Sequence, residues 1–188
     1  MRDTDLLPAL AAVMHEDTLA ALRGERLRFD FFESPFGRCL IAQHGGLLCW
    51  LSFAGDDHTA ALADMQAAWP GVSFIQDAAG CVSLAARLLH GHEALPIALF
   101  GTPFQRQVWH ALLDIPAGET TSYGALAQRI GRPSAARAVG AAVGANPISW
   151  IVPCHRVVLK DGRVHNYRWG VEVKRALLKA EVAAFRLT

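Results

Sequence analysis

A cysteine and a histidine stand side by side between two apolar stretches, and no other pair in the chain is as well suited to chemistry. Residues 150–152 are apolar, Pro153 interrupts them, Cys154 and His155 follow, and two valines resume the apolar pattern after Arg156. Pro153 fixes its own φ and donates no hydrogen bond, so the chain must turn and hold the thiol on a constrained backbone. The basic neighbours favour the thiolate, the nucleophilic form of cysteine. The pattern indicates a reactive thiol, with a small buried hydrophobic residue as the alternative.

A carboxylate near the C-terminus could orient that imidazole. Residues 171–185 have the spacing of a helix, and Glu181 falls on its apolar face. We expect that face to consist of Leu178, Val182 and Phe185. A carboxylate in such a setting needs a partner to offset its desolvation, and His155 is the best candidate. The alternative is a glutamate at a helix end that reaches water.

The loop before that helix carries aromatic and cationic side chains. It runs over residues 164–170 and contains Tyr167 and Trp169, two cations and a final glycine. Such a loop is suited to stack on and enclose a flat ligand.

The segment before the thiol has the pattern of a helix-turn-helix. Thr121 or Ser122 should cap a helix over residues 123–130, a Gly-Arg-Pro turn follows, and Ser134 should cap a second helix over residues 135–144. The second helix is almost entirely Ala, Val and Gly, and its only charge is an arginine. Either its small residues let it press against nucleic acid, with nearby arginines on phosphates, or it is a close-packed core helix.

Charge divides the chain in two. Residues 1–100 hold six Lys/Arg and twelve Asp/Glu, a net of −6, whereas residues 101–188 hold twelve and five, a net of +7. The basic half predicts a polyanion as partner, although mutual attraction of the two halves would give the same count.

No apolar run reaches the roughly 18 residues of a membrane span, and the start lacks a signal-peptide core, so we expect a cytoplasmic protein. The four cysteines have no metal-binding or disulfide spacing, so neither a zinc site nor a disulfide framework is indicated. We expect no metal and no cofactor.

The first half should be a scaffold of the α/β (α+β) class. We expect a helix over residues 5–22, three antiparallel strands over residues 27–32, 38–42 and 47–53, and helices over residues 59–69 and 79–91. Residues 96–103 read as a connector, and Thr102 should cap a helix that begins at Pro103. Two domains are therefore predicted, residues 1–99 and residues 100–188, the second mostly helical.

The run Pro153–Val157, with the helix-turn-helix and Asn146 before it and Asn166–Tyr167 after it, resembles the O6-alkylguanine-DNA alkyltransferases. The resemblance covers about residues 101–181, and residues 167–170 look most like the alkyltransferase part of bacterial Ada proteins. It implies a ribonuclease-H-like first domain and a winged-helix-like second one. It also implies a monomer without metal or cofactor that acts on double-stranded DNA containing O6-alkylguanine, with O4-alkylthymine as a further candidate.

The resemblance also implies roles for individual residues. Cys154 would accept the alkyl group, His155 would take the thiol proton through a water, and Glu181 would orient His155. Tyr167 would aid departure of the guanine, while Arg137 would fill the gap left by the rotated base. The further catalytic residues would be Asn146, which holds the turn, and Lys174, which supports the thiolate. The DNA-binding set would be Arg137, Tyr123, which pushes on the 3′ phosphate, Ser122, Arg156, Ala135, Ala136 and Gly140. The pocket set would be Val157, Val164, His165, Asn166, Arg168 and Trp169.

Two positions depart from the family pattern, and both are often glycine in the family. His165 would shift the loop if its φ were positive. Trp169 would narrow the pocket and favour methyl over benzyl adducts. Three other classes stay open: a helix-turn-helix regulator with an inert Cys154, a lesion-binding protein without transfer, and a cysteine hydrolase, for which no oxyanion loop is evident.

Overall fold

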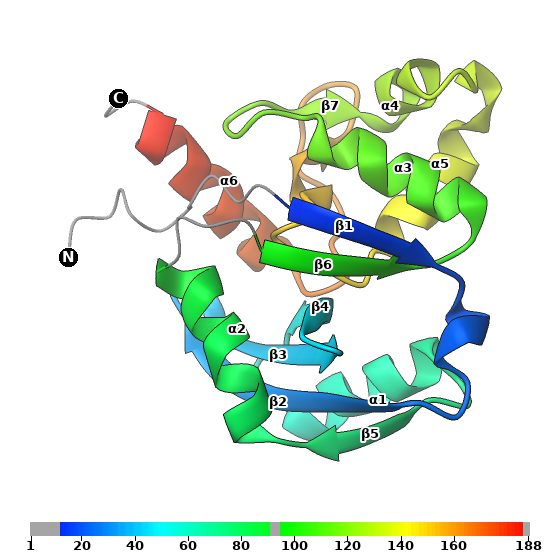
Figure 1. Cartoon of the computed structure of the whole chain (residues 1–188). Helices are drawn as coiled ribbons and strands as arrows, with labels where there is room; N and C mark the ends of the chain where they lie inside the picture. Colours follow the sequence, from blue (N-terminus) through cyan, green and yellow to red (C-terminus); the bar gives the residue numbers. More distant parts are fainter. Residues whose placement is uncertain (1–11, 91–94, 186–188) are drawn as a thin grey trace. The chain divides into compact units, whose positions relative to one another are not determined.

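The computed structural model describes residues 12–90 and 95–185 (Figure 1). The chain divides into two compact units, with the division between Gly101 and Thr102. The predicted boundary, between residues 99 and 100, lies two residues from this division.

The first unit is built on a mixed sheet of six described strands (Figure 1). They are β1 (Ala12–Asp17), β2 (Arg26–Ser34), β3 (Gly37–His44), β4 (Leu47–Phe53), β5 (Ser73–Gln76) and β6 (Leu95–Phe100). Their order is β1-β6-β4-β3-β2-β5. Strands β2, β3 and β4 are antiparallel, as predicted, whereas β1, β5 and β6 join by parallel pairing. The sheet is thus larger than the three strands predicted.

Two sequence predictions in this unit are wrong. Residues 12–17, expected in a helix, form β1, and Leu19–Leu22 form a single 3-10 turn; residues 5–11 of the predicted helix lie outside the described residues. The predicted connector over residues 96–103 is largely β6. Strands β1 and β6 pair with each other although about 80 residues of chain separate them. Pairing with so distant a partner overrides local helix propensity.

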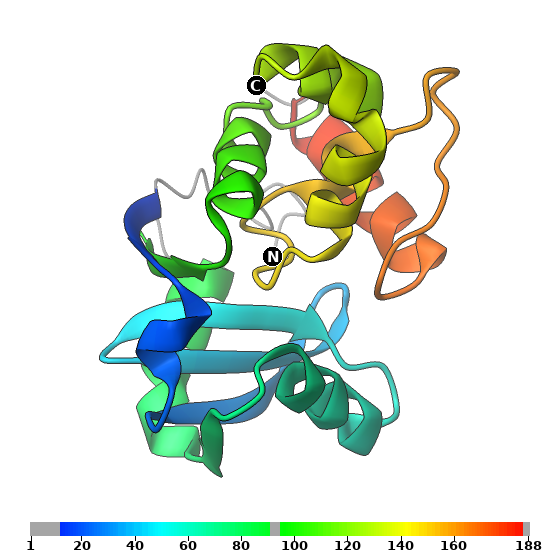
Figure 2. The same cartoon turned by 90° about the vertical axis from the view of Figure 1, so that its right-hand side faces the viewer.

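Helices cover both faces of this sheet (Figure 2). Helix α1 (His58–Ala68) and helix α2 (Ala78–His90) match the predicted segments to within one residue at each end. Leu40 of β3 belongs to the core on which Met65 of α1 packs. Gln43, three residues further along β3, instead donates to the Gly80 carbonyl of α2 at 3.3 Å. The alternation of side chains along a strand therefore assigns α1 and α2 to opposite faces.

The second unit is mainly helical. Its elements are α3 (Pro103–Leu113), β7 (Thr121–Ser122), α4 (Tyr123–Arg129), a 3-10 turn (Pro133–Ala135), α5 (Ala136–Gly144), a 3-10 turn (Cys154–Arg156), β8 (Val157–Val158) and α6 (Val171–Phe185). Thr102 caps α3 as predicted, because its side chain accepts from the Gln105 amide while the Gln105 side chain accepts from the Thr102 amide. Short strands β7 and β8 pair in parallel.

Helices α4 and α5 form the predicted helix-turn-helix. Ser122 caps α4 by accepting from the Ala125 amide at 3.1 Å. Ser134 does not cap α5, because it lies inside the preceding 3-10 turn and Ala135 occupies the cap position without a side-chain hydrogen bond. Trp109 of α3 donates to the Ala142 carbonyl at 2.8 Å and fixes α5 against α3.

Helix α6 turns a different face inward from the one predicted. Its buried residues are Lys174, Leu177 and Glu181, whereas Val182 is 41% exposed; the Phe185 side chain lies outside the description. Glu181 therefore shares its buried face with Lys174 and Leu177 rather than with the predicted aliphatic stripe. Among the described residues, no helix is long and apolar enough to cross a membrane, and no group of three or more His, Cys, Asp and Glu side chains could hold a metal ion.

Candidate active site

Cys154 lies at the start of a 3-10 turn and is 3% exposed. Its amide donates to the Val152 carbonyl at 2.7 Å across Pro153, which has φ −81° and ψ 60°, the pattern of an inverse γ-turn. Pro153 therefore supplies the constrained turn that the sequence predicted.

Asn146 cross-links the segment that leads to the thiol. Its side chain is completely buried. The Nδ2 group donates to the carbonyls of Ile148 and Val152 at 3.2 and 2.9 Å and to Cys154 Sγ at 3.1 Å. The Oδ1 atom accepts from the Ile148 amide at 3.0 Å. One side chain thus closes the turn after α5 and also touches the sulfur.

Behind the thiol, His155 and Glu181 form the buried pair that the sequence predicted. His155 Nε2 lies 2.8 Å from Glu181 Oε1, and both side chains are at most 1% exposed. Arg156 donates to the same carboxylate at 2.7 to 3.1 Å, and the Gly118 amide donates to it at 3.1 Å. Burial alone would raise the pKa of Glu181, but the hydrogen bonds from His155 and Arg156 outweigh burial and lower the pKa to about 2.

The carboxylate also fixes the state of the imidazole. Because ionised Glu181 can only accept, Nε2 of His155 carries the proton and Nδ1 has the free lone pair. Nδ1 is buried and has no hydrogen-bond partner among the described residues. Burial lowers the pKa of His155 although Glu181 opposes the shift. A neutral histidine whose lone pair is not engaged in a hydrogen bond can act as a base.

Lys174 and Tyr167 complete the surroundings of the sulfur. Lys174 Nζ donates to the Val157 carbonyl at 2.6 Å and lies 5.8 Å from the Tyr167 ring centre. Burial lowers the pKa of this lysine, while the charge of a Cys154 thiolate raises it. The Tyr167 hydroxyl lies 3.8 Å from Cys154 Sγ. Burial raises the pKa of Cys154, and Asn146, Tyr167 and Lys174 each oppose that rise.

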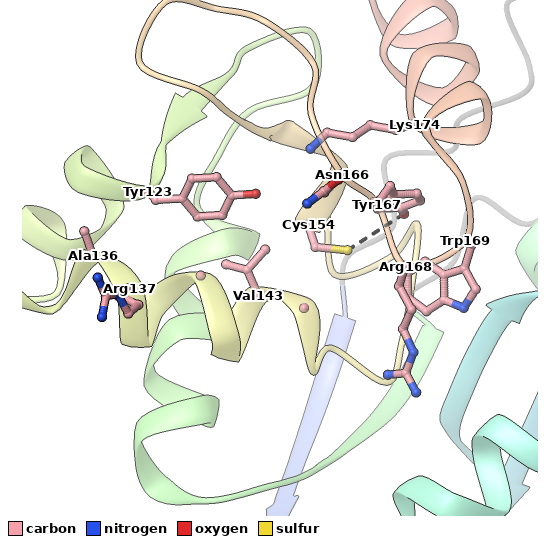
Figure 3. A pocket seen from close by; sticks show the side chains of 12 residues that line it. Tyr123, Ala136, Arg137, Val143, Cys154, Asn166, Tyr167, Arg168, Trp169 and Lys174 are labelled. Carbon is pink, nitrogen blue, oxygen red and sulfur yellow. Dashed lines mark hydrogen bonds between the residues drawn. The ribbon is translucent and has the colours of Figure 1, made fainter.

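A cavity of about 670 Å³ opens in front of Cys154. Figure 3 shows the sulfur between side chains of the helix-turn-helix and side chains of the loop before α6. The ring of Tyr167 meets that of Trp169 edge to face, with centres 5.1 Å apart. The guanidinium of Arg168 lies 5.8 Å from the Trp169 ring centre. The cavity therefore has an aromatic wall, a nucleophile at its base and cations around it.

Ten of the predicted site residues line this cavity. They are Tyr123, Ala136, Arg137, Gly140, Cys154, Asn166, Tyr167, Arg168, Trp169 and Lys174. Val143 and Gly144 also line it and were not predicted. They follow Ala136 and Gly140 at helical spacing, so the face of α5 could have been read from its periodicity. Ser149, buried and 2.8 Å from the Tyr167 hydroxyl, was also missed, because a serine within an apolar run carries no such signal.

The other predicted residues lie behind or beside the cavity. His155, Glu181 and Asn146 support Cys154 from within the protein. Arg156, expected on DNA, is instead bound to Glu181 and to the Ile115 carbonyl. The remaining five are Ser122, which caps α4, Ala135 at the start of α5, Val157, buried in β8, and Val164 and His165, which are half-buried and exposed in the loop.

The unusual backbone in the loop is at Asn166, not at His165. Asn166 has φ 36°, whereas His165 does not have a positive φ. Asparagine tolerates this region better than most residues. The exposed side chain of His165 is therefore accommodated without the strain expected from the sequence.

Known proteins resemble both the sequence and this structure. Residues 103–183 match the family described as 6-O-methylguanine DNA methyltransferase, DNA binding domain. The regulatory protein ada of Salmonella typhimurium is 40% identical over 161 residues, which cover 82% of this chain and 45% of that protein. The methylated-DNA–protein-cysteine methyltransferase of Mycobacterium bovis is 39% identical over 162 residues, which cover 82% of this chain and 92% of that protein.

A crystal structure of Mycobacterium tuberculosis OGT in complex with DNA has a TM-score of 0.65 and 38% identity, covering 85% of this chain and 94% of that chain. The chain spans about half the length of several curated relatives, with 45%, 47% and 52% of three of them covered.

Proposed function

Because the chain belongs to the family of methylated-DNA–protein-cysteine methyltransferases, we propose that it repairs DNA by transferring the alkyl group of O6-alkylguanine to its own Cys154. The observation that carries this proposal is a thiol at the base of a cavity with a buried His155–Glu181 pair behind it. O4-alkylthymine is a second candidate substrate.

The proposed step exchanges an alkyl group for a proton. Cys154 Sγ bonds to the alkyl carbon while the bond between that carbon and guanine O6 breaks. The thiol proton passes through a water to Nδ1 of His155, and Glu181 stabilises the imidazolium. The guanine leaves as an anion, which the Tyr167 hydroxyl stabilises, and later takes up a proton. A thioether does not release its alkyl group under these conditions, so each molecule reacts once.

The charges around the thiol support this division of roles. Burial raises the pKa of Cys154, so a base is needed to form the thiolate near neutral pH. Burial lowers the pKa of His155, which keeps the imidazole neutral and able to accept a proton. Lys174 places a positive charge near the sulfur once the thiolate forms.

DNA would meet the cavity through the helix-turn-helix. Arg137 is exposed at the cavity and would fill the place of the rotated base, while Tyr123 would press on the 3′ phosphate. The small side chains of α5 suit the narrow minor groove. Turning a base out of the duplex costs a few kcal/mol, and least for a weakened pair. The adduct would thereby reach Cys154, which a stacked base cannot.

The proposal extends to finer features of the protein. The first unit would be a ribonuclease-H-like scaffold, and the second a winged-helix-like domain that binds DNA and transfers the alkyl group. The protein would act as a monomer, without metal or cofactor, in the bacterial cytoplasm. Trp169 would make methyl a better substrate than benzyl, because its ring forms part of the cavity wall.

Intact-mass measurement after incubation with a duplex containing O6-methylguanine tests the proposal. We expect a gain of about 14 Da per molecule, the mass of one transferred methyl group, and no second product from excess duplex. Cys154→Ala should gain nothing, while Cys81→Ala, which removes another buried cysteine, should react as the wild type does. Binding without a mass gain would instead indicate a lesion-binding or regulatory protein, and repeated turnover would indicate a hydrolase.

A further inference from the structure

Ser149 carries a buried hydroxyl group that forms a hydrogen bond with the hydroxyl of Tyr167. Its side chain is 0% exposed, and Oγ lies 2.8 Å from the Tyr167 hydroxyl. Within the described part of the chain, Tyr167 is the only hydrogen-bond partner of this hydroxyl. The role assigned to Tyr167 in alkyl transfer does not by itself account for Ser149.

The direction of this hydrogen bond follows from counting donors. If Tyr167 donated to Ser149, the serine proton would be buried without an acceptor, at a cost of about 1–3 kcal/mol. If Ser149 donates, its proton is satisfied on Tyr167 Oη, and the phenolic proton is not used on Ser149. That oxygen can also accept from the Cys154 thiol, 3.8 Å away. The second arrangement satisfies the buried Ser149 hydroxyl and lets the tyrosine donate into the cavity that it lines.

The backbone around Ser149 is held in an uncommon conformation. Trp150 has φ 67°, and the Ile151 amide donates to the Ser149 carbonyl at 2.7 Å. This is a γ-turn centred on a residue with positive φ, which is rare and strained for a bulky side chain. Asn146 binds the carbonyls of Ile148 and Val152 on either side of it. The strain persists because these contacts fix the turn, and the turn fixes where Ser149 stands.

We propose that Ser149 is a positioning residue, which donates to the Tyr167 hydroxyl and thereby directs the phenolic proton toward the base in the cavity. A phenol that accepts a hydrogen bond is also a stronger donor, because linked hydrogen bonds polarise one another. The inference rests on the proposed alkyl transfer and adds to it a residue that touches neither the thiol nor the substrate.

Single-turnover kinetics with an O6-methylguanine duplex tests this role. We expect Ser149→Ala to lower the maximal rate constant about five- to tenfold, the worth of one hydrogen bond of roughly 1 kcal/mol. The duplex concentration at half-maximal rate should stay unchanged, because Ser149 is buried away from DNA. Ser149→Thr keeps the hydroxyl and should recover most of the rate.

A double-mutant cycle separates positioning from general loosening of the site. In a Tyr167→Phe background the phenolic proton is already absent, so Ser149→Ala should slow the reaction no further. An equal slowing in both backgrounds, or a Thr variant as slow as the Ala variant, would overturn the proposed role. A wild-type protein that transfers no methyl group would defeat the function itself, whereas a fast Ser149→Ala would defeat only this inference.

Discussion

Asn146 should be the polar residue whose loss most disturbs the site. Asn146→Ala removes the bond from the Ile148 amide, those to the Ile148 and Val152 carbonyls, and the contact to Cys154. Since one amide group carries only two N–H donors, these contacts amount to about three full hydrogen bonds. At about 1 kcal/mol each, with a further 1–3 kcal/mol for the Ile148 amide left buried without an acceptor, we expect the free energy of unfolding to fall by about 4–6 kcal/mol.

Asn146→Asp tests the same geometry with almost no change in shape. One carboxyl oxygen would face two carbonyls and the sulfur where Nδ2 now donates, so the folded state should favour the protonated acid. A carboxyl pKa raised on folding means that the folded state binds more protons. Stability is then greatest below the unfolded pKa, near 3.9, and falls as the pH rises through the folded pKa, by about 1.4 kcal/mol per pH unit.

Urea unfolding of the wild type and both variants measures these effects. The deficit of Asn146→Asp should be smaller at pH 5 than at pH 7, whereas that of Asn146→Ala should be the same at both. Gln128→Ala, which removes an exposed amide from α4, is the control and should change stability little. A deficit below about 1 kcal/mol for Asn146→Ala would refute the claim that this side chain holds the turn. An Asn146→Asp variant that loses the same stability at pH 5 and pH 7 would also refute it.

Four further outcomes follow from the site. Arg156→Ala should destabilise the fold by about 3–5 kcal/mol in urea unfolding, because it leaves buried Glu181 without its cation. Arg137→Ala should instead leave stability unchanged and slow alkyl transfer from duplex DNA, because no side chain would then fill the place of the rotated base. Trp169→Gly should speed reaction with benzyl adducts more than with methyl adducts, and equal changes would contradict a narrowed pocket. In single-turnover assays the wild-type rate should begin to fall only well below pH 6.5, the ordinary pKa of histidine, because burial lowers the pKa of His155; a fall centred above that value would contradict its role as base.

Local chemistry predicted the centre of the site. The Pro-Cys-His run placed a constrained turn and an imidazole at residues 153–155. Of the two alternatives that the sequence left open for Glu181, the structure has the one in which it pairs with His155. Thr102, Ser122 and the turn between α4 and α5 were likewise readable from capping and breaking residues. These features depend on neighbours within a few residues, or on a charge that only one type of partner can satisfy.

Features that depend on tertiary pairing could not be predicted. Strand β1 looks helical in sequence, and its partner β6 comes about 80 residues later. The family resemblance placed Arg156 in the DNA-binding set, whereas its guanidinium donates to Glu181 in the structure. The inward face of α6 includes Lys174 and Glu181, which form hydrogen bonds with Val157 and His155. A search for apolar residues along the helix therefore does not find this face.

Tandem mass spectrometry of the reacted protein tests the central claim most directly, because it identifies which of the four cysteines carries the alkyl group. After reaction with an O6-methylguanine duplex, the account predicts S-methylation at Cys154 and none at Cys39, Cys49 or Cys81. Burial raises the pKa of each of these three buried cysteines. A methyl group on any other residue, or none on Cys154 while the duplex is repaired, would contradict the account.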